Sequence, residues 1–240
     1  MERVRDKVDY LFQCFLEAIY PTEEKCYVCN KDGEKIICDK CKGKIQKANE
    51  TLIIEECEML ICSYYSFIVK DLILRLKYKG DFHAGEILVM LLEEKIKESN
   101  LDVDFITYVP VAKDSLKKKE FNQCEYLSKE LGKRLRIKSI ETLKKKNKVK
   151  EQKSLSKEER EKNVQNAFCL KSYKNLEGKS IILLDDVMTT GSTLKACVRE
   201  LKKLKILKFF YWLLLKVIYN SNVARFVVES RCQSQAKRST

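Results

Sequence analysis

Glycine, proline and histidine are scarce in this chain of 240 residues, which contains only 7 Gly, 2 Pro and a single His. Together with 45% hydrophobic and 35% charged residues, this scarcity argues against a disordered protein and for a globular one. The only histidine, His83, excludes any mechanism that requires two histidines. The length allows one domain of ordinary size with its own core, plus a small module.

The sequence also lacks recognisable export and membrane-anchoring segments. Its first residues carry charges of both signs, and the apolar stretch 10–20 is interrupted by Gln13 and Glu17, so no secretory signal is expected. The apolar residues of 204–215 are too interrupted by lysine for a transmembrane helix. We therefore expect a cytoplasmic protein with no membrane insertion.

Basic residues, by contrast, are in excess, with 48 Lys and Arg against 35 Asp and Glu and a net charge of +13. Residues 113–162 contain 18 Lys and Arg but 9 Asp and Glu, so +9 of the +13 lies in about a fifth of the chain. Such a concentration favours an anionic partner, either nucleic acid or a phosphorylated substrate. A generally lysine-rich composition, with no functional meaning, is the alternative.

Four of the eleven cysteines form two C-x-x-C pairs, Cys26 with Cys29 and Cys38 with Cys41. Two such pairs on a short hairpin, with Gly33 at its turn, can present four thiolates to a structural zinc ion. Zinc would stabilise a segment too small to bury a core, and four protein ligands would leave no open position for catalysis. A redox dithiol is the alternative, although one pair would suffice for it. The remaining cysteines are expected to be mostly small buried residues.

The stretch 181–193 carries the clearest chemical signal. Its four apolar residues predict a buried parallel strand, which is followed by Asp185 and Asp186 and then by a loop that opens a helix. Ligands bind at such strand ends in open α/β sheets. Two carboxylates suit vicinal hydroxyls, and the loop suits a phosphate monoester through backbone N–H groups and side-chain hydroxyls, so the stretch predicts a ribose 5-phosphate site. The loop residues are Met188, Thr189, Thr190, Gly191, Ser192 and Thr193.

An ordinary strand, an Asx-rich turn and a capped helix would explain these pieces separately but not their order. Elsewhere, apolar periodicity predicts helices over 1–20, 67–77, 82–98 and 121–133, and strands over 61–65, 105–111, 137–143 and 208–213. Together these elements predict an α/β fold.

All thirteen residues of 181–193 resemble the phosphoribosyl-diphosphate (PRPP) binding motif of the type I phosphoribosyltransferases. The resemblance implies that Asp185 and Asp186 hold the ribose hydroxyls, that the loop holds the 5-phosphate, and that Mg²⁺ bridges ribose and diphosphate oxygens. A lysine-rich segment after the strand 105–111 would then face the diphosphate and neutralise its charge, through Lys113, Lys117, Lys118 and Lys119. A solvated lysine run is the alternative. Gln152 lies in a second basic segment, which is expected to be a loop folding over the substrate.

Over residues 22–203 the order of motifs resembles the late-competence ComF family, of the ComFC/GntX type. The motifs are the cysteine pairs, Lys-Tyr-Lys-Gly at 77–80, Val-Pro-Val at 109–111, Phe-Asn-Gln at 121–123, Gln152, Arg160 and Asn163 before Ala167-Phe168, and the stretch 181–193. The resemblance implies an N-terminal zinc ribbon joined to a type I phosphoribosyltransferase-like parallel sheet, and a role in DNA uptake during natural transformation.

We expect four regions: an N-terminal helix at 1–21, a four-cysteine zinc ribbon at 22–50, a phosphoribosyltransferase-like domain at 51–215, and an atypical tail at 216–240. The composition of the tail indicates either disorder or the product of a shifted reading frame. Three positions depart from the family. Lys119-Glu120 stands where the family has Arg-Gly, Val149 stands in place of a threonine, and no glycine-containing turn follows the helix beginning at Thr193.

Two functions follow as alternatives. The first is a PRPP-binding phosphoribosyltransferase whose acceptor no residue identifies. The second is a non-catalytic protein that keeps the fold and binds single-stranded DNA and a competence helicase. The basic segment and the aromatic residues beside it, Tyr78 and Phe121, support the second.

Overall fold

A computed structural model describes residues 25–33, 36–48, 51–54, 57–64, 66–111, 121–146, 166–171, 176–188 and 191–216. The chain forms two compact units, residues 1–43 and residues 44–240. The helix predicted over 1–20 and nearly all of the tail, residues 217–240, lie outside the described residues.

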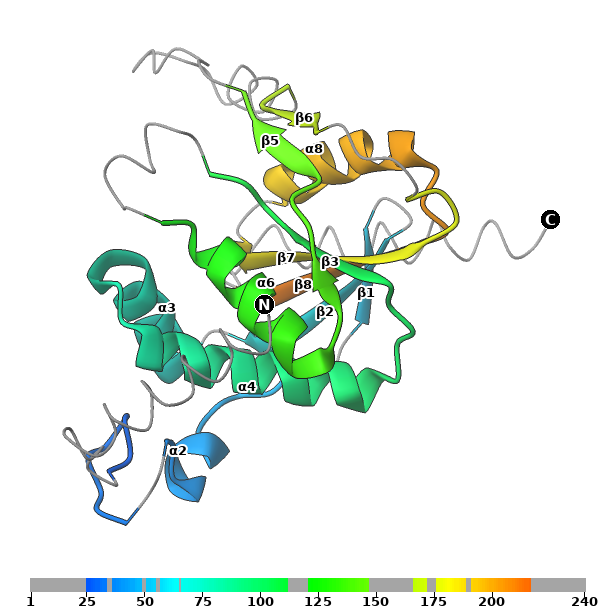
Figure 1. Cartoon of the computed structure of the whole chain (residues 1–240). Helices are drawn as coiled ribbons and strands as arrows, with labels where there is room; N and C mark the ends of the chain where they lie inside the picture. Colours follow the sequence, from blue (N-terminus) through cyan, green and yellow to red (C-terminus); the bar gives the residue numbers. More distant parts are fainter. Residues whose placement is uncertain are drawn as a thin grey trace, which may run out of the picture. The chain divides into compact units, whose positions relative to one another are not determined.

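The larger unit is built on a six-stranded sheet with the strand order β1-β2-β8-β7-β3-β4 (Figure 1). Strand β1 pairs antiparallel with β2, and every other pairing in the sheet is parallel. This arrangement confirms the predicted α/β fold with a parallel sheet. The strands are β1 (Thr51–Ile54), β2 (Cys57–Tyr64), β3 (Phe105–Tyr108), β4 (Lys138–Ser139), β7 (Ser180–Met188) and β8 (Lys208–Lys216).

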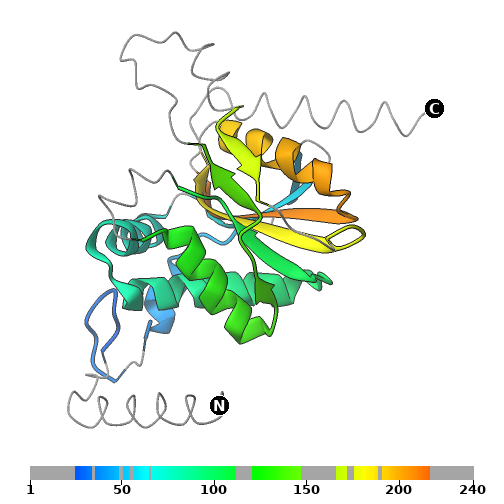
Figure 2. The same cartoon turned by 45° about the horizontal axis from the view of Figure 1, so that its top comes forward.

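Helices cover the sheet on both faces (Figures 1 and 2). On one face lie α3 (Phe67–Lys79), α4 (Phe82–Ser99) and α6 (Gln123–Leu135). On the other lies α8 (Ser192–Leu201), followed by the 3-10 turn η1 (Lys202–Leu204) and accompanied by the antiparallel pair β5 (Leu143–Lys145) and β6 (Phe168–Leu170). Parallel strands covered on both faces are buried, which is why β7 and β8 read as apolar runs.

The helix boundaries follow from local chemistry. α3 buries Val69, Leu72, Ile73 and Leu76 on one side and ends at Gly80, whose φ of 63° is the left-handed conformation that glycine adopts readily. α4 and α6 each begin at a side-chain cap. The carboxylate of Asp81 accepts from the Ala84 N–H at 3.3 Å, and the Asn122 side chain accepts from the Cys124 N–H at 3.0 Å.

Strand β8 lies in the middle of the sheet, between β2 and β7. The strand expected over 208–213 is therefore confirmed, and it extends to Lys216. Its register places Tyr211 opposite Leu183 of β7, and the Tyr211 side chain is fully buried. A C-terminal segment that lacks the glycine-containing turn expected of the family thus still supplies a central strand.

The strand predicted over 137–143 is wrong in its extent. Residues 138–139 form β4 on the edge of the main sheet, whereas 143–145 form β5 in the separate two-stranded sheet. Between them the Ile140 N–H donates to the Ile106 carbonyl at 2.8 Å, and the Thr107 and Thr142 hydroxyls lie 2.7 Å apart. These interactions accompany the exit of the chain from the main sheet, and the pattern of apolar residues does not predict them.

The connections leaving β7 and β3 run in opposite directions. After β7 the chain passes through α8 to β8 on one side, and after β3 it passes through α6 to β4 on the other. Since α6 and α8 lie on opposite faces, the carboxyl ends of β3 and β7 flank a topological switch point (Figure 2). Open α/β sheets bind their ligands at such a point.

Candidate functional site

Asp185 and Asp186 lie at this switch point. The Val109 N–H, just past the end of β3, donates to the Leu184 carbonyl of β7 at 3.0 Å, so the two aspartates follow directly on the last paired residues of β3. Contrary to the expectation of a strand ending before them, both belong to β7, which continues to Met188. Both residues are buried, with 7% and 6% of their surface exposed.

Asp186 accepts hydrogen bonds from two helices. Its Oδ2 atom accepts from Lys77 Nζ of α3 at 2.9 Å and from Gln123 Nε2 of α6 at 2.8 Å. Its Oδ1 atom accepts from the Val187 N–H at 2.9 Å. The negative charge of Asp186 is therefore neutralised inside the protein by one lysine and held by two further donors.

Asp185 has a different set of partners. Tyr211 of β8 donates its hydroxyl to Asp185 Oδ2 at 2.6 Å, and the Asp186 N–H donates to Oδ1 at 2.9 Å. The buried thiol of Cys124 lies 3.9 Å from the same Oδ1 atom. Among these partners none carries a positive charge.

The two carboxyl groups consequently differ in pKa. Burial and the charge of Asp186 raise the pKa of Asp185 to about 7, although the Tyr211 hydroxyl opposes this. Burial acts on Asp186 as well, but there the charge and hydrogen bond of Lys77, helped by Gln123, lower the pKa below its usual value. Asp186 is therefore ionised at neutral pH, whereas Asp185 titrates close to neutral pH.

The raised pKa of Asp185 predicts a pH-dependent stability. A carboxyl with a folded pKa near 7 and an unfolded pKa of about 3.9 contributes stability at low pH that is lost as the pH rises through about 7. The pKa of Asp186 is shifted downward, so its contribution to stability changes only at more acidic pH. We expect Asp185→Asn to be more stable relative to wild type at pH 8 than at pH 5, by about 2 kcal/mol, measured by urea unfolding. Parallel pH profiles for the two proteins would contradict the assignment.

The start of α8 has the features of an anion-binding loop. Gly191 occupies the N-cap position with φ 75° and ψ 1°, a conformation that favours glycine. Gly191 itself supplies no side-chain cap, and the backbone N–H groups at the start of a helix suit an anion. The predicted loop residues Met188, Ser192 and Thr193 lie at the end of β7 and in the first turn of α8, whereas Thr189 and Thr190 lie outside the described residues.

The predicted diphosphate residues Lys113, Lys117, Lys118, Lys119 and Gln152 also lie outside the described residues. In contrast, the structure brings Lys77, Gln123 and Tyr211 to the aspartate pair, and sequence reasoning proposed none of them as site residues. Two of the three belong to the Lys-Tyr-Lys-Gly and Phe-Asn-Gln motifs, so the motifs themselves contained the signal.

The four paired cysteines come together in the smaller unit. One sulfur atom from each of Cys26, Cys29, Cys38 and Cys41 lies within 4.8 Å of all the others. The first pair lies on a turn closed by the Cys26 N–H donating to the Lys31 carbonyl at 2.8 Å. The second pair spans the start of the short helix α2 (Asp39–Gly43) rather than a hairpin strand.

The donor set fits a tetrahedral metal. Zinc–sulfur bonds of about 2.3 Å in a tetrahedron place sulfur atoms about 3.8 Å apart, and the Cys29 and Cys38 sulfurs are separated by 3.7 Å. Although burial opposes it, N–H groups of Cys38, Cys29 and Val28 lower the pKa of Cys26 to about 6, as a thiolate ligand requires. Burial and the neighbouring thiols raise the pKa of Cys41 to about 12, a cost that a bound cation would remove.

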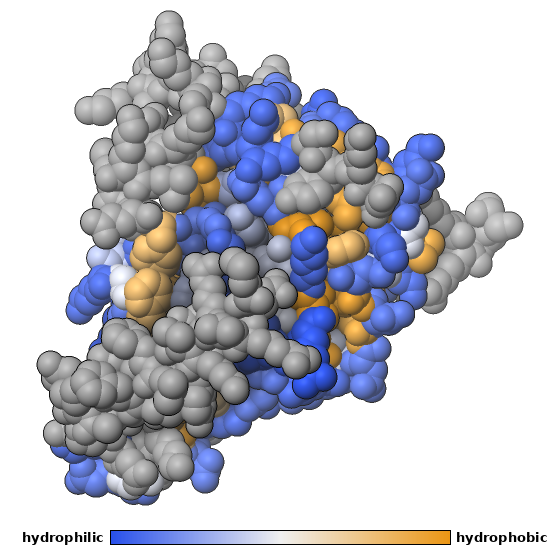
Figure 3. All heavy atoms as spheres, viewed as in Figure 1, coloured by the Kyte–Doolittle hydropathy of each residue, from blue (hydrophilic) through white to orange (hydrophobic). Residues whose placement is uncertain are grey.

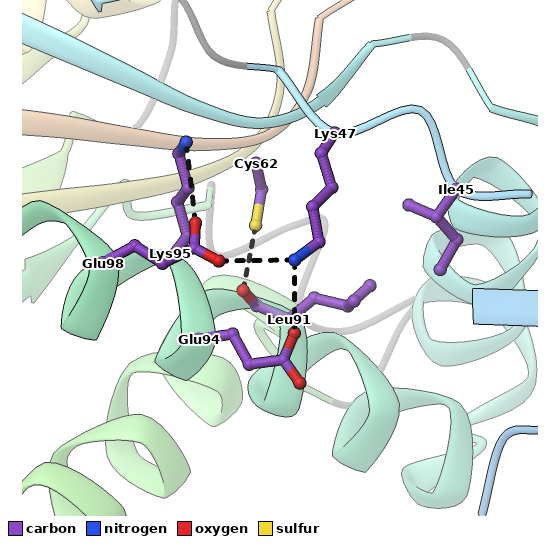
Figure 4. A pocket seen from close by; sticks show the side chains of 7 residues that line it. All are labelled: Ile45, Lys47, Cys62, Leu91, Glu94, Lys95 and Glu98. Carbon is purple, nitrogen blue, oxygen red and sulfur yellow. Dashed lines mark hydrogen bonds and ion pairs between the residues drawn. The ribbon is translucent and has the colours of Figure 1, made fainter. Parts of the chain in front are cut away.

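A small cavity lies away from the aspartates, between residues 45–47, β2 and α4 (Figure 4). Its volume of about 10 Å³ corresponds to about one water molecule. Lys47 reaches across it to Glu94 and Glu98 at 3.7 and 3.3 Å, and the Cys62 thiol donates to the Leu91 carbonyl. These contacts attach the start of the larger unit to α4 and leave no space for a substrate.

A basic groove lies at the other edge of the sheet, beside the C-terminal part of α6 and the start of β4. It is lined by Lys129, Gly132, Lys133, Arg136, Ile137, Lys138 and Ser139. Lys129 and Lys133 pair with Glu125 and Glu130 on α6, both at 2.7 Å, whereas Arg136 and Lys138 form no ion pair with a described residue. Most of the described surface on the face shown in Figure 3 is hydrophilic, with scattered hydrophobic patches.

Comparison with known proteins agrees with this geometry. The model of the phosphoribosyl transferase domain family matches residues 123–209, from the start of α6 into β8. Competence protein F of Haemophilus influenzae is 30% identical over 162 residues, which cover 65% of this chain and 71% of that protein. Competence protein ComFC of Streptococcus pneumoniae is 30% identical over 187 residues, covering 76% and 74%.

A crystal structure of an adenine phosphoribosyltransferase is more distant. It aligns with a TM-score of 0.41 and 13% identity over 57% of this chain and 72% of that one. The sheet order, the switch point and the matching domain family define a phosphoribosyltransferase-like α/β protein. Within that class, the chain belongs to the ComF family of competence proteins. None of the described helices has the length and apolar character needed to span a membrane.

Proposed function

We propose that this protein binds PRPP together with Mg²⁺ at the switch point between β3 and β7 and acts in competence, in the uptake of DNA during natural transformation. One observation carries the proposal. A buried carboxylate pair near the end of the central parallel strand is followed, one short loop later, by a helix that begins at a glycine N-cap. The carboxylates can accept hydrogen bonds from a diol, and the backbone N–H groups at the start of the helix can donate to a phosphate. One short loop separates the two groups.

In the proposed complex, Asp185 and Asp186 hold the ribose hydroxyls, and residues Met188 to Thr193 hold the 5-phosphate. Lys113, Lys117, Lys118, Lys119 and Gln152 face the diphosphate. Bound Mg²⁺ would supply positive charge that offsets the negative charge of the diphosphate. If an acceptor is present, diphosphate leaves the anomeric carbon through an oxocarbenium-like transition state, and the protein contributes mainly positioning and electrostatics.

The first test is calorimetric titration of PRPP with and without Mg²⁺. We expect binding that requires Mg²⁺, because the ligand brings several negative charges next to a carboxylate pair. Ribose 5-phosphate should bind more weakly, since it lacks the diphosphate. Absence of PRPP binding to folded protein at any Mg²⁺ concentration would reject the proposal.

The N-terminal cysteine cluster is proposed to bind a structural Zn²⁺ through Cys26, Cys29, Cys38 and Cys41. All four positions of a tetrahedron would be filled by sulfur, so the metal would stabilise the smaller unit without taking part in chemistry. The clustering of the sulfur atoms and the lowered pKa of Cys26 support this role.

A second function is favoured by the basic groove beside α6. Arg136 and Lys138 form no ion pair within the part of the chain that the structure describes, and such side chains suit the phosphates of single-stranded DNA. A competence helicase would be the partner that delivers or receives this DNA. Because β4 pairs with the first residues of β3, the groove lies at the opposite end of the strands from the aspartates. DNA binding there should fall steeply with salt and be independent of Asp185 and Asp186, unlike PRPP binding.

A further inference from the structure

Lys77 is an unexpected member of the aspartate site. It lies in the last turn of α3, is 109 positions away from Asp186 in the sequence, and precedes the region matched by the phosphoribosyl transferase domain family. Its ammonium group nevertheless contacts Asp186 Oδ2 at 2.9 Å, with side-chain exposures of 23% for Lys77 and 9% for Asp186. A lysine so largely buried against a single carboxylate indicates a specific role at this site.

The lone pairs of Asp186 leave little room for a ligand. A carboxylate has about four lone-pair positions. Three of those on Asp186 are used by Lys77, Gln123 and the Val187 N–H. Both positions on Oδ2 are taken, by Lys77 and Gln123, so a ribose hydroxyl that binds this oxygen requires one of the two donors to leave.

Of the three donors, Lys77 is the one suited to leave. The Val187 N–H is fixed in the backbone of β7, and Gln123 is the first residue of α6, held in place by the Asn122 cap. Lys77 has a flexible four-carbon stem and three rotatable donors, and it carries the charge that an anionic ligand attracts. If it leaves, Asp186 keeps the neutral hydrogen bond of Gln123 on the same oxygen.

We propose that Lys77 is a displaceable counter-ion, which neutralises Asp186 in the free protein and transfers to the diphosphate of PRPP when the ligand binds. The transfer frees an acceptor on Asp186 for a ribose hydroxyl and gives the diphosphate a cation from α3. The diphosphate is the favoured target because Gln123, which shares Asp186 Oδ2 with Lys77, follows closely on the segment proposed to face it. The inference rests on the proposed PRPP site and deepens it.

Two ligands test the transfer, PRPP with Mg²⁺ and ribose 5-phosphate, which has no diphosphate. Lys77→Met should lower the ratio of PRPP affinity to ribose 5-phosphate affinity by about 10- to 100-fold, the loss expected for one charge-assisted hydrogen bond to the diphosphate, measured by calorimetry. Binding of ribose 5-phosphate should not weaken, because the variant has no ion pair to break before a hydroxyl reaches Asp186. The matched control is Lys79→Met, which removes an equal charge from an exposed residue two positions further along the same helix and should leave the ratio of the two affinities as in wild type.

Each result decides between specific interpretations. Equal losses for both ligands in Lys77→Met would mean that the lysine only stabilises Asp186, and would overturn the transfer. An equal effect of Lys79→Met would reduce the role of Lys77 to general charge and would also overturn it. Should Lys77→Met fail to fold, Lys77→Gln keeps a neutral donor for Asp186 and gives the same comparison. If the wild-type protein does not bind PRPP, that result alone rejects the proposed function, and the proposed transfer of Lys77 is rejected with it.

Discussion

Replacing Asp185 and Asp186 together by asparagine is expected to abolish PRPP binding without unfolding the protein. Each carboxylate that accepts from a ribose hydroxyl contributes a charge-assisted hydrogen bond of about 1.5–3 kcal/mol, so losing two lowers the affinity by about 10²- to 10⁴-fold. Calorimetry of PRPP with Mg²⁺, on wild type and double variant side by side, measures this directly.

The fold is expected to tolerate the double change. The amide oxygen at position 185 can still accept from Tyr211, and the one at 186 can still accept from Gln123. Lys77 loses its counter-charge, but its side chain is 23% exposed and can extend to water. Removing the carboxyl of Asp185, which burial and its neighbour hold near a pKa of 7, also relieves charge repulsion.

Asp71→Asn provides the matched control, because it removes one carboxylate from the exposed side of α3 without touching the pair. Its PRPP affinity should equal that of wild type. Retained affinity in a folded Asp185→Asn/Asp186→Asn protein would show that the ligand, if bound at all, is bound elsewhere. Circular dichroism and the urea midpoint establish that the variant is folded.

Local pattern was sufficient to predict the elements that lie next to one another in sequence. The apolar run before Asp185 predicts β7, and the apolar spacing in 67–77 and 82–98 predicts α3 and α4 within two residues of their observed ends. The two C-x-x-C pairs predict the sulfur cluster that the structure shows. In each case the information lies within a few turns of chain, where periodicity and spacing act directly.

What could not be predicted depends on contacts between distant segments. Nothing in the apolar run between Lys208 and Lys216 indicates that β8 lies between β2 and β7, or that its Tyr211 donates to Asp185. The ion pair of Lys77 with Asp186 joins residues more than a hundred positions apart. Long-range pairing of this kind depends on the whole sheet, so a helix-terminal lysine is read as an ordinary basic helix end.

The zinc prediction is tested by Cys26→Ser, which is expected to release the metal and unfold the smaller unit. Structural zinc contributes about 10–16 kcal/mol in small metal-stabilised folds, and α2 is one of the few regular elements described there, so little else stabilises this unit. The zinc content, measured by mass spectrometry, should fall from one ion per chain to a small fraction, and the segment 22–50 should become sensitive to protease.

The control for this change is Cys169→Ser, which alters a half-buried cysteine of β6 in the larger unit, outside the sulfur cluster. It should retain its zinc and its protease resistance. An unchanged metal content in Cys26→Ser would refute a four-sulfur site, because the remaining three thiolates would then be sufficient. Loss of zinc together with unaltered PRPP binding would instead show that the cysteine cluster stabilises its own unit and takes no part in the chemistry of the aspartate pair.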